Sequence, residues 1–189
     1  MYKKIILGSG SPRRFELLKS IWQGEIEVIK SDIDEIYPED LALVKIPIFL
    51  AKLKADDLKT KLDLSNQILV TADTIVICDN QVLGKPKDQE DAKSMLQFLS
   101  NKVHQVITGV AIYSQDKCLE IEETTHVYFG DLSETEIDFY IANFHPLDKA
   151  GAYGIQDYIG MIGIQKIDGC YYNVMGLPTG RVWRELKEF

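Results

Sequence analysis

Cysteine, histidine and long apolar runs are scarce in this sequence, and each scarcity argues against a class of protein. The cysteines Cys78, Cys118 and Cys170 are odd in number and far apart, so they cannot close a disulfide framework. We therefore expect reduced thiols in a cytoplasmic protein. The three histidines show no zinc-ligand spacing. Apolar stretches stop well short of the roughly 20 residues that a membrane helix needs, so we expect no membrane partner.

Positive charge is scarce as well. The chain carries 21 lysines and arginines against 29 aspartates and glutamates, which gives a net charge of −8. Such a surface is a poor match for the phosphate backbone of nucleic acid, and we expect no nucleic-acid partner. An anionic small molecule could still bind where the few cations are concentrated. The 189 residues suffice for one domain, 1–189, with a substantial core.

Hydrophobic periodicity alternates between strand and helix patterns along the whole chain. The expected strands are Lys4–Gly8, Glu25–Lys30, Gln67–Ile77, Val103–Tyr113, residues 119–129, and two short strands that turn at Asp168-Gly169. The expected helices begin at Ser11-Pro12, Pro47, Asp88 and Ser133, and after Gly176-Leu177-Pro178. This alternation, with some hairpins, predicts an α/β fold built on a mixed sheet.

The segment Gly8–Arg14 joins a strand to a helix through small residues. Such a junction directs free backbone N–H groups and the positive end of the helix dipole toward an anion. Arg13 and Arg14 oppose that dipole, which is unfavourable unless an anion is present. The spacing fits either an anion site or two solvated arginines, and it lacks the Walker pattern.

Asp73 interrupts an otherwise apolar strand. A charge in that setting needs a partner, a metal or a shifted pKa, and such acids concentrate at active sites. The alternative is an aspartate satisfied by backbone N–H groups at a strand end or bulge. Two lysines, Lys54 on the second helix and Lys85 in Gly84-Lys85-Pro86, read as ordinary surface lysines when taken singly.

Small residues fill the loop Asp148–Gln156, where they would let a ligand approach the backbone closely. The amide of Gln156 offers both a donor and an acceptor, which suits the edge of a nucleobase. A well-packed loop is the plainer alternative. Together with the cations and Asp73, this loop indicates an enzyme that acts on phosphate esters or nucleotides.

These motifs resemble the Maf family of nucleoside triphosphate pyrophosphatases, once described as septum-formation inhibitors. The matching segments occur in family order over essentially the whole chain: Ser9–Arg14 with Glu16-Leu17-Leu18, Lys54-Ala55, Ala72-Asp73-Thr74, Leu83–Pro86, His104–Val110, Asp148–Gln156, Tyr172-Asn173-Val174 and Gly176-Leu177-Pro178. Ala72-Asp73-Thr74 and Gly154-Ile155-Gln156 are similar to the branch that acts on dTTP and UTP. The branch that acts on 7-methyl-GTP typically carries Ser-Asp-Gln and Ser-Glu at those two places.

The resemblance implies an elongated mixed β-sheet flanked by helices, with two lobes around a central cleft, as in Maf and ITPase-like proteins, and often a homodimer. It implies cleavage of dTTP and UTP between the α- and β-phosphates, giving the monophosphate and pyrophosphate. Modified pyrimidine nucleotides are further expected substrates, so that non-canonical nucleotides are kept out of nucleic acids. The resemblance also implies a divalent cation, Mg²⁺ or Mn²⁺, as cofactor.

Residue roles follow from the same motifs. Asp73 is either the proton acceptor for the attacking water or a metal ligand, and Glu35 assists the metal. The residues expected to bind substrate are Ser9, Arg13, Arg14, Lys54, Thr74, Lys85 and Gln156, of which Arg13, Thr74 and Gln156 set substrate choice. The alternative function is a nucleotide-binding regulator of septum formation and cell division that acts through a protein partner.

Overall fold

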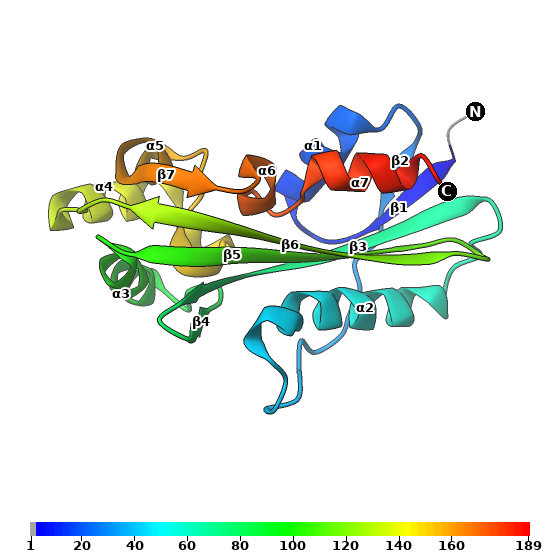
Figure 1. Cartoon of the computed structure of the whole chain (residues 1–189), viewed down its shortest axis with the longest axis horizontal. Helices are drawn as coiled ribbons and strands as arrows, with labels where there is room; N and C mark the ends of the chain where they lie inside the picture. The colour runs from blue at the N-terminus through cyan, green and yellow to red at the C-terminus, as the bar shows by residue number, and fades with distance from the viewer. Residues whose placement is uncertain (1–2) are drawn as a thin grey trace. The chain divides into compact units, whose positions relative to one another are not determined.

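The computed structural model describes residues 3–189 and contains a seven-stranded sheet flanked by helices (Figure 1). The strand order is β2-β1-β3-β5-β6-β7, and β4 pairs with β3 outside that row. The pairs β1–β2 and β1–β3 are parallel, whereas β3–β4 and β6–β7 are antiparallel. The predicted α/β fold on a mixed sheet is confirmed.

The strands are β1 (Lys4–Gly8), β2 (Ile26–Val28), β3 (Gln67–Cys78), β4 (Gln81–Leu83), β5 (Val103–Tyr113), β6 (Cys118–Phe129) and β7 (Ile164–Asp168). The helices are α1 (Pro12–Ile21), α2 (Ile46–Lys59), α3 (Gln89–Leu99), α4 (Glu134–Phe144), α5 (Tyr158–Gly163), α6 (Tyr171–Val174) and α7 (Thr179–Leu186). Short 3₁₀ turns cover Leu43–Lys45, Pro146–Asp148 and Ala150–Ala152.

The chain divides into two compact units. The first holds the described residues through Asp73, together with 108–123 and 176–189. The second holds residues 74–107 and 124–175. The strands β3, β5 and β6 each supply residues to both units. The expectation of a single domain over 1–189 stays a prediction.

In the first unit, helices cover both faces of the parallel strands. Figure 1 shows α2 on one side of β1, and α1 and α7 on the other. An apolar stripe on α2 faces the sheet, where it is buried together with residues of β1, β3 and β5: Ile48, Ala51, Ala55 and Leu58 on α2, and Ile6, Leu69 and Ala111 on the strands. Burial of this stripe, at about 25 cal/mol per Å² of apolar surface, holds α2 against the sheet.

Gly109 on β5 lets α2 approach the sheet closely. A Cβ atom at this position would overlap backbone atoms of Pro47 and Ile48 in the first turn of α2. Pro47 is tolerated there because its missing N–H has no helical partner in the first turn. The start of α2 therefore rests on bare strand backbone, and this contact fixes where the later residues of the helix lie.

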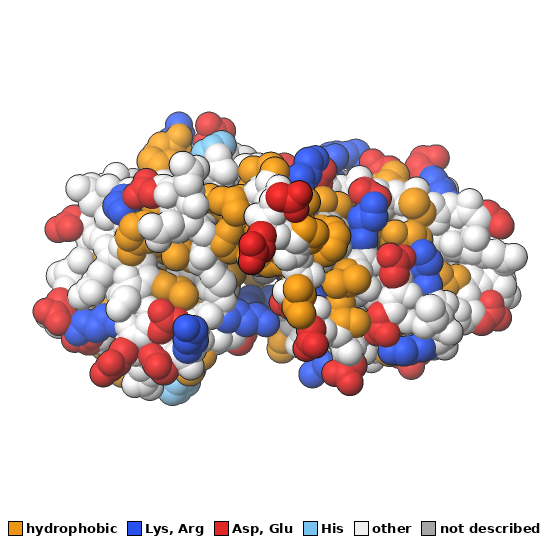
Figure 2. Space-filling view, turned by 90° about the horizontal axis from the view of Figure 1, so that it is seen from below, with side chains coloured by type: hydrophobic (Ala, Val, Ile, Leu, Met, Phe, Trp, Pro, Cys, Tyr) orange, Lys and Arg blue, Asp and Glu red, His pale blue; other side chains and the backbone are white. Residues whose placement is uncertain are grey.

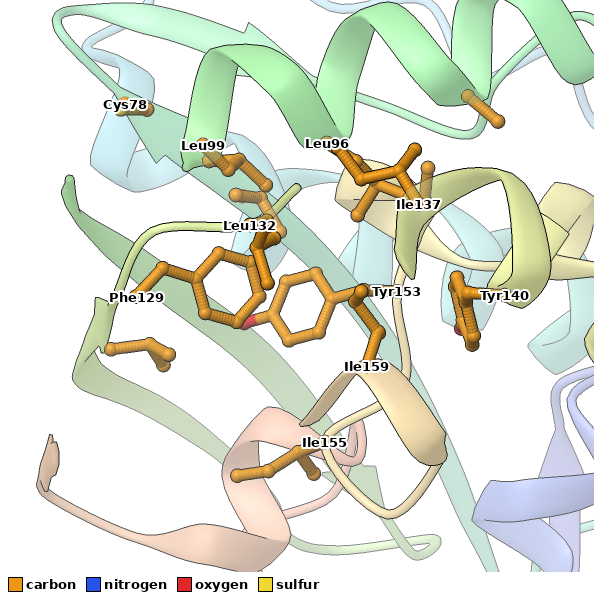
Figure 3. Close-up of a cluster of buried hydrophobic side chains, with 14 of the residues drawn as sticks. Cys78, Leu96, Leu99, Phe129, Leu132, Ile137, Tyr140, Tyr153, Ile155 and Ile159 are labelled. Carbon is orange, nitrogen blue, oxygen red and sulfur yellow. The ribbon is translucent and has the colours of Figure 1, made fainter. Parts of the chain in front are cut away.

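The second unit is built around its own apolar core, part of which Figure 3 shows. The rings of Phe129 and Tyr153 meet edge to face, with 5.0 Å between their centroids. The buried ring of His104 packs against both, and its Nε2 lies 2.7 Å from the hydroxyl of Tyr153. Burial lowers the pKa of His104 to about 4. This core holds the loop that contains Tyr153, because Ala152, Ile155 and Ile159 are buried in it as well.

Most predicted elements are confirmed, with small shifts at their ends. The predicted strand Glu25–Lys30 is shorter, since β2 covers only Ile26–Val28, and α2 begins one residue before Pro47. The turn at Asp79-Asn80 joins β3 and β4 into a hairpin, with positive φ at both residues.

One predicted strand is wrong. Residues after the Asp168-Gly169 turn form the short helix α6 instead of a second strand. The reason is local: the hydroxyl of Thr125 donates to the carbonyl of Cys170 at 3.1 Å and accepts from its N–H at 3.0 Å. The N–H and the carbonyl of Cys170 are therefore both hydrogen-bonded to the side chain of Thr125, so neither group is available to pair with a neighbouring strand.

Charges of both signs are mixed over the face of the molecule shown in Figure 2. Neither the lysine and arginine side chains nor the acidic ones gather into a wide area of one sign on that face. Within residues 3–189, no helix combines the length and the apolar character that crossing a bilayer requires.

Candidate active site

The junction between β1 and α1 forms as the sequence predicts. Ser11 is the N-cap, and its side-chain oxygen accepts from the backbone N–H of Arg14 at 3.5 Å. Pro12 follows at the first helical position, and the first turn contains no acidic residue. The positive end of the helix dipole therefore stays uncompensated by any acid of that turn, which favours an anion nearby.

Arg14 is fixed by contacts at two nitrogen atoms. Its Nε donates to the carbonyl of Gly176 at 2.9 Å, and its Nη1 donates to the hydroxyl oxygen of Ser9 at 3.1 Å. Burial lowers the pKa of Arg14, while the negative charge of Asp73 opposes that shift and the neighbouring charge of Arg13 adds to it. A partly buried guanidinium held in one orientation is suited to bind phosphate oxygens.

Lys54 lies between two carboxylates. Its Nζ is 2.6 Å from Oδ1 of Asp73 on β3 and 2.6 Å from Oε1 of Glu35 in the loop before α2. The side chains of Lys54 and Asp73 are only 12% and 11% exposed, whereas that of Glu35 is 50% exposed. Lys52, two residues earlier on α2, instead pairs with Glu120 at the surface. Lys52 therefore lies at the surface, whereas Lys54 lies in the candidate site.

Asp73 is a buried acid, as the sequence indicates. Burial raises the pKa of its carboxyl group, while the positive charges of Lys54 and Arg14 lower it and Glu35 raises it. The raised pKa makes this carboxylate a better proton acceptor than an ordinary aspartate, and the two cations keep it available in the charged form.

A second group of predicted residues belongs to the second unit. The N–H of Gly151 donates to the carbonyl of Gly84 at 3.0 Å, which joins the Gly84-Lys85-Pro86 turn to the small-residue loop. Gly151 has φ +67°, and a Cβ atom there would lie 3.0 Å from the side chain of Val76. Lys85 is exposed. The two sequence motifs are therefore parts of one local structure.

Gln156 ends that loop beside an acidic residue. Its Nε2 donates to Oδ1 of Asp157 at 3.1 Å. Its Oε1 is buried and has no hydrogen-bond partner among residues 3–189. On the other side of the carboxylate, Lys149 Nζ lies 3.4 Å from Oδ2 of Asp157 and 3.2 Å from Oδ1 of Asp148.

The match to a known family extends over nearly the whole chain. The sequence model of the family described as "Maf-like protein" matches residues 4–189. The chain belongs to the Maf family.

Relatives of this Maf chain share close to half of its residues. A protein from Flavobacterium psychrophilum named dTTP/UTP pyrophosphatase is 50% identical over 180 residues, which cover 95% of this chain and 91% of that protein. One from Porphyromonas gingivalis strain W83, with the same name, is 46% identical over 98% of this chain and 94% of its own length. A solved nucleoside-triphosphatase (dITP/XTP pyrophosphatase) from Mycobacterium abscessus has a TM-score of 0.41 and 12% identity, over 68% of this chain and 75% of that one. A likeness that weak supports no inference about activity.

The structure brings part of the predicted Maf site together. Ser9 and Arg14 are hydrogen-bonded to each other, and Lys54 contacts both Asp73 and Glu35. Arg13 shares the first turn of α1 with Arg14. Thr74, Lys85 and Gln156 belong to the second unit, and their contacts with substrate stay predictions.

Three further residues, which the sequence did not predict as site residues, lie near the predicted ones. The side chain of Lys30 lies over Gly10, where a Cβ atom would be 2.8 Å from its Cε. Lys149 is only 10% exposed, and its place inside the Asp148–Gln156 motif is the signal that could have found it. Asp157 lies just outside the motif and gives no such signal.

Proposed function

We propose that this chain is a dTTP/UTP pyrophosphatase, a hydrolase that converts these nucleoside triphosphates to the monophosphate and pyrophosphate. The names of relatives that are 46–50% identical over nearly its whole length support this activity. The observation that carries the proposal is the buried Asp73–Lys54 pair with the partly buried Arg14 close enough for their charges to interact, because it supplies an acid and two cations at one place.

The chemistry of the reaction suits these groups. The oxygen of a water molecule forms a new bond to phosphorus, the bond between the α- and β-phosphates breaks, and one proton of the water is released. Cleavage of a phosphoanhydride depends mainly on positioning and on neutralising charge. Arg14 and Lys54 supply positive charge for the phosphates. Asp73 serves either as the acceptor of the proton or as a ligand of the cation that activates the water.

The donor set fits a hard divalent cation such as Mg²⁺ or Mn²⁺. Asp73 and Glu35 offer carboxylate oxygens on the two sides of one ammonium group. No group of three or more potential ligands (His, Cys, Asp, Glu) is gathered for a metal within residues 3–189. Mg²⁺ is commonly held by one or two carboxylates together with substrate phosphates, as this site would allow. When bound, the cation shields the phosphates and lowers the pKa of bound water.

The remaining assignments extend the same proposal. Ser9 and Lys85 bind phosphate oxygens, and Arg13, Thr74 and Gln156 set the choice of nucleotide. Dimerisation and a cytoplasmic location belong to the proposal as well, on the strength of the family pattern and the free thiols.

The test is pyrophosphate release by the purified full-length protein with Mg²⁺ or Mn²⁺. We expect release from dTTP and UTP, and much less from CTP, ATP, GTP and 7-methyl-GTP. The variant Asp73→Asn should show none above background. Asp116→Asn makes the same chemical change at an exposed turn and should retain the activity.

Other outcomes would revise the proposal in specific ways. Release from a different nucleotide would keep the reaction and overturn the substrate choice. No release from any nucleotide, with either metal, would overturn the enzymatic function and favour a regulator that binds nucleotides.

A further inference from the structure

Asp157 is the centre of a small hydrogen-bond network in the second unit. Its Oδ1 accepts from Nε2 of Gln156 at 3.1 Å, and its Oδ2 accepts from the hydroxyl of Tyr140 at 3.0 Å. Lys149 Nζ approaches Oδ2 at 3.4 Å. The side chain of Asp157 is 17% exposed, so these contacts are largely shielded from water.

The hydrogen bonds that pass through Tyr140 all donate toward Asp157. The backbone N–H of Gly154 donates to the hydroxyl oxygen of Tyr140 at 3.1 Å, and that hydroxyl donates to Asp157. Burial and the charge of Asp157 raise the pKa of Tyr140, so its hydroxyl stays protonated and remains a donor. Asp157 thus receives a donor at each of its two carboxyl oxygens.

This arrangement determines which end of the Gln156 amide faces Asp157. An amide has a donor end and an acceptor end, and a free amide can turn either one toward a neighbour. A carboxylate accepts and cannot donate, so it binds the NH₂ end and turns Oε1 away.

The oxygen that is turned away lacks a partner. Gln156 Oε1 is buried and accepts no hydrogen bond from the described residues. A buried acceptor without a donor costs free energy, and each such case in a native structure calls for an explanation. A ligand that brings an N–H group to this atom would remove the cost.

The backbone around this amide is held firmly. Ile155 and Ile159 are buried in the core of the second unit. A Cβ atom on Gly160 would overlap the carbonyl of Ile155, so the chain folds tightly back on itself just after Asp157. The amide is therefore presented from a fixed loop.

We infer that Asp157 is a positioning residue for nucleobase selection: it fixes the amide of Gln156 so that Oε1 accepts the N3–H of uracil or thymine. This inference rests on the proposed function. Uracil and thymine both carry an N–H donor at N3, whereas cytosine has an acceptor at N3. An oxygen held opposite N3 therefore accepts the first two bases and repels the third, and a freely turning amide would lose that distinction.

The experiment compares UTP with N3-methyl-UTP, in which the N3 donor is replaced by a methyl group. In the wild-type protein we expect kcat/KM for N3-methyl-UTP to be at least about tenfold lower than for UTP, mostly through KM. Equal kcat/KM for the two nucleotides would overturn the inference while UTP turnover still supports the pyrophosphatase activity. Absence of UTP turnover would overturn the proposed function and the inference with it.

The variant Asp157→Asn isolates the positioning role, because asparagine can both donate and accept and so permits either orientation of Gln156. We expect the penalty for the N3-methyl group and the preference for UTP over CTP to shrink about tenfold, with a melting temperature that shows a folded protein. Asp116→Asn should leave both ratios unchanged. A uniform loss of activity in Asp157→Asn, with both ratios preserved, would show a merely structural role and overturn the inference.

Discussion

Lys54 Nζ lies 2.6 Å from Oδ1 of Asp73, and both side chains are about nine-tenths buried. The pair joins α2 to β3, so it links two elements that are distant in sequence at the place where the chemistry is expected. A buried acid next to a buried cation is costly to desolvate, so the pair is weak evidence of stabilisation, and strongly perturbed acids cluster at functional sites.

Replacing the carboxylate of Asp73 should abolish activity and keep the fold. Asp73→Asn has the same size, and Lys54 retains its contact with Glu35. We expect turnover of dTTP to fall by about three orders of magnitude or more, which corresponds to about 4 kcal/mol of transition-state stabilisation. Steady-state kinetics measures the loss, and circular dichroism checks the fold. Near-normal turnover would remove Asp73 from the reaction.

The pH dependence of kcat/KM should report the environment of Asp73. Because burial raises the pKa of this carboxyl group, the acid limb of the profile should lie above 3.8, the ordinary aspartate value. Lys54 lowers that pKa, so Lys54→Met should move the limb to higher pH in the activity that remains. A limb that stays in place in this variant would show that another group controls it.

His104 should make the folded protein less stable in acid. Its pKa is about 4 in the folded state against 6.5 for an ordinary histidine, so the unfolded chain binds the extra proton first as pH falls. Stability from this group is complete above pH 6.5 and declines toward pH 4, by about 3 kcal/mol. In His104→Gln, the free energy of unfolding by urea should lose less over this range than in the wild type. An unchanged slope would contradict the buried, neutral state of His104.

Thr125 should be far more important for stability than its neighbour. Its hydroxyl bonds both backbone groups of Cys170 and also accepts from Nδ2 of Asn173 at 3.0 Å. Thr125→Val keeps the shape and leaves these buried groups unsatisfied, so we expect a loss of about 3 kcal/mol in the free energy of unfolding. The exposed Thr124→Val is the matched control and should stay within about 0.5 kcal/mol of the wild type. Equal effects of the two changes would count against this role of Thr125.

Local sequence signals predicted most of the fold because they are short-range. The helices expected to begin at Ser11-Pro12, Asp88 and Ser133 do begin there, with Ser11, Asp88 and Ser133 as their N-caps. Each depends on contacts within a few residues. The strand expected after Asp168-Gly169 failed because the competing partner, Thr125, lies 45 residues away from Cys170.

A residue of the candidate site could be predicted from the sequence when its type is unusual for the local sequence around it. Asp73 stands out as a charge in an apolar strand, and the structure buries it. Lys54 has no such local mark, because a lysine on a helix is ordinarily solvated; the family motif indicated it, and its contacts with Asp73 and Glu35 distinguish it from Lys52. Asp157 was invisible for the same reason: its partner Tyr140 lies 17 residues earlier, on α4.

The lack of a side chain at Gly109 affects more than the packing of α2 on β5. A single methyl group there would lift the first turn of α2 from β5, and the helix would carry Lys54 with it as a rigid rod. Such a displacement would lower activity from a position that touches no reactant, because misplacing a catalytic group by about 1 Å can cost about 10²-fold in rate. The choice of residue at position 109 therefore affects the reaction even though glycine has no chemistry of its own.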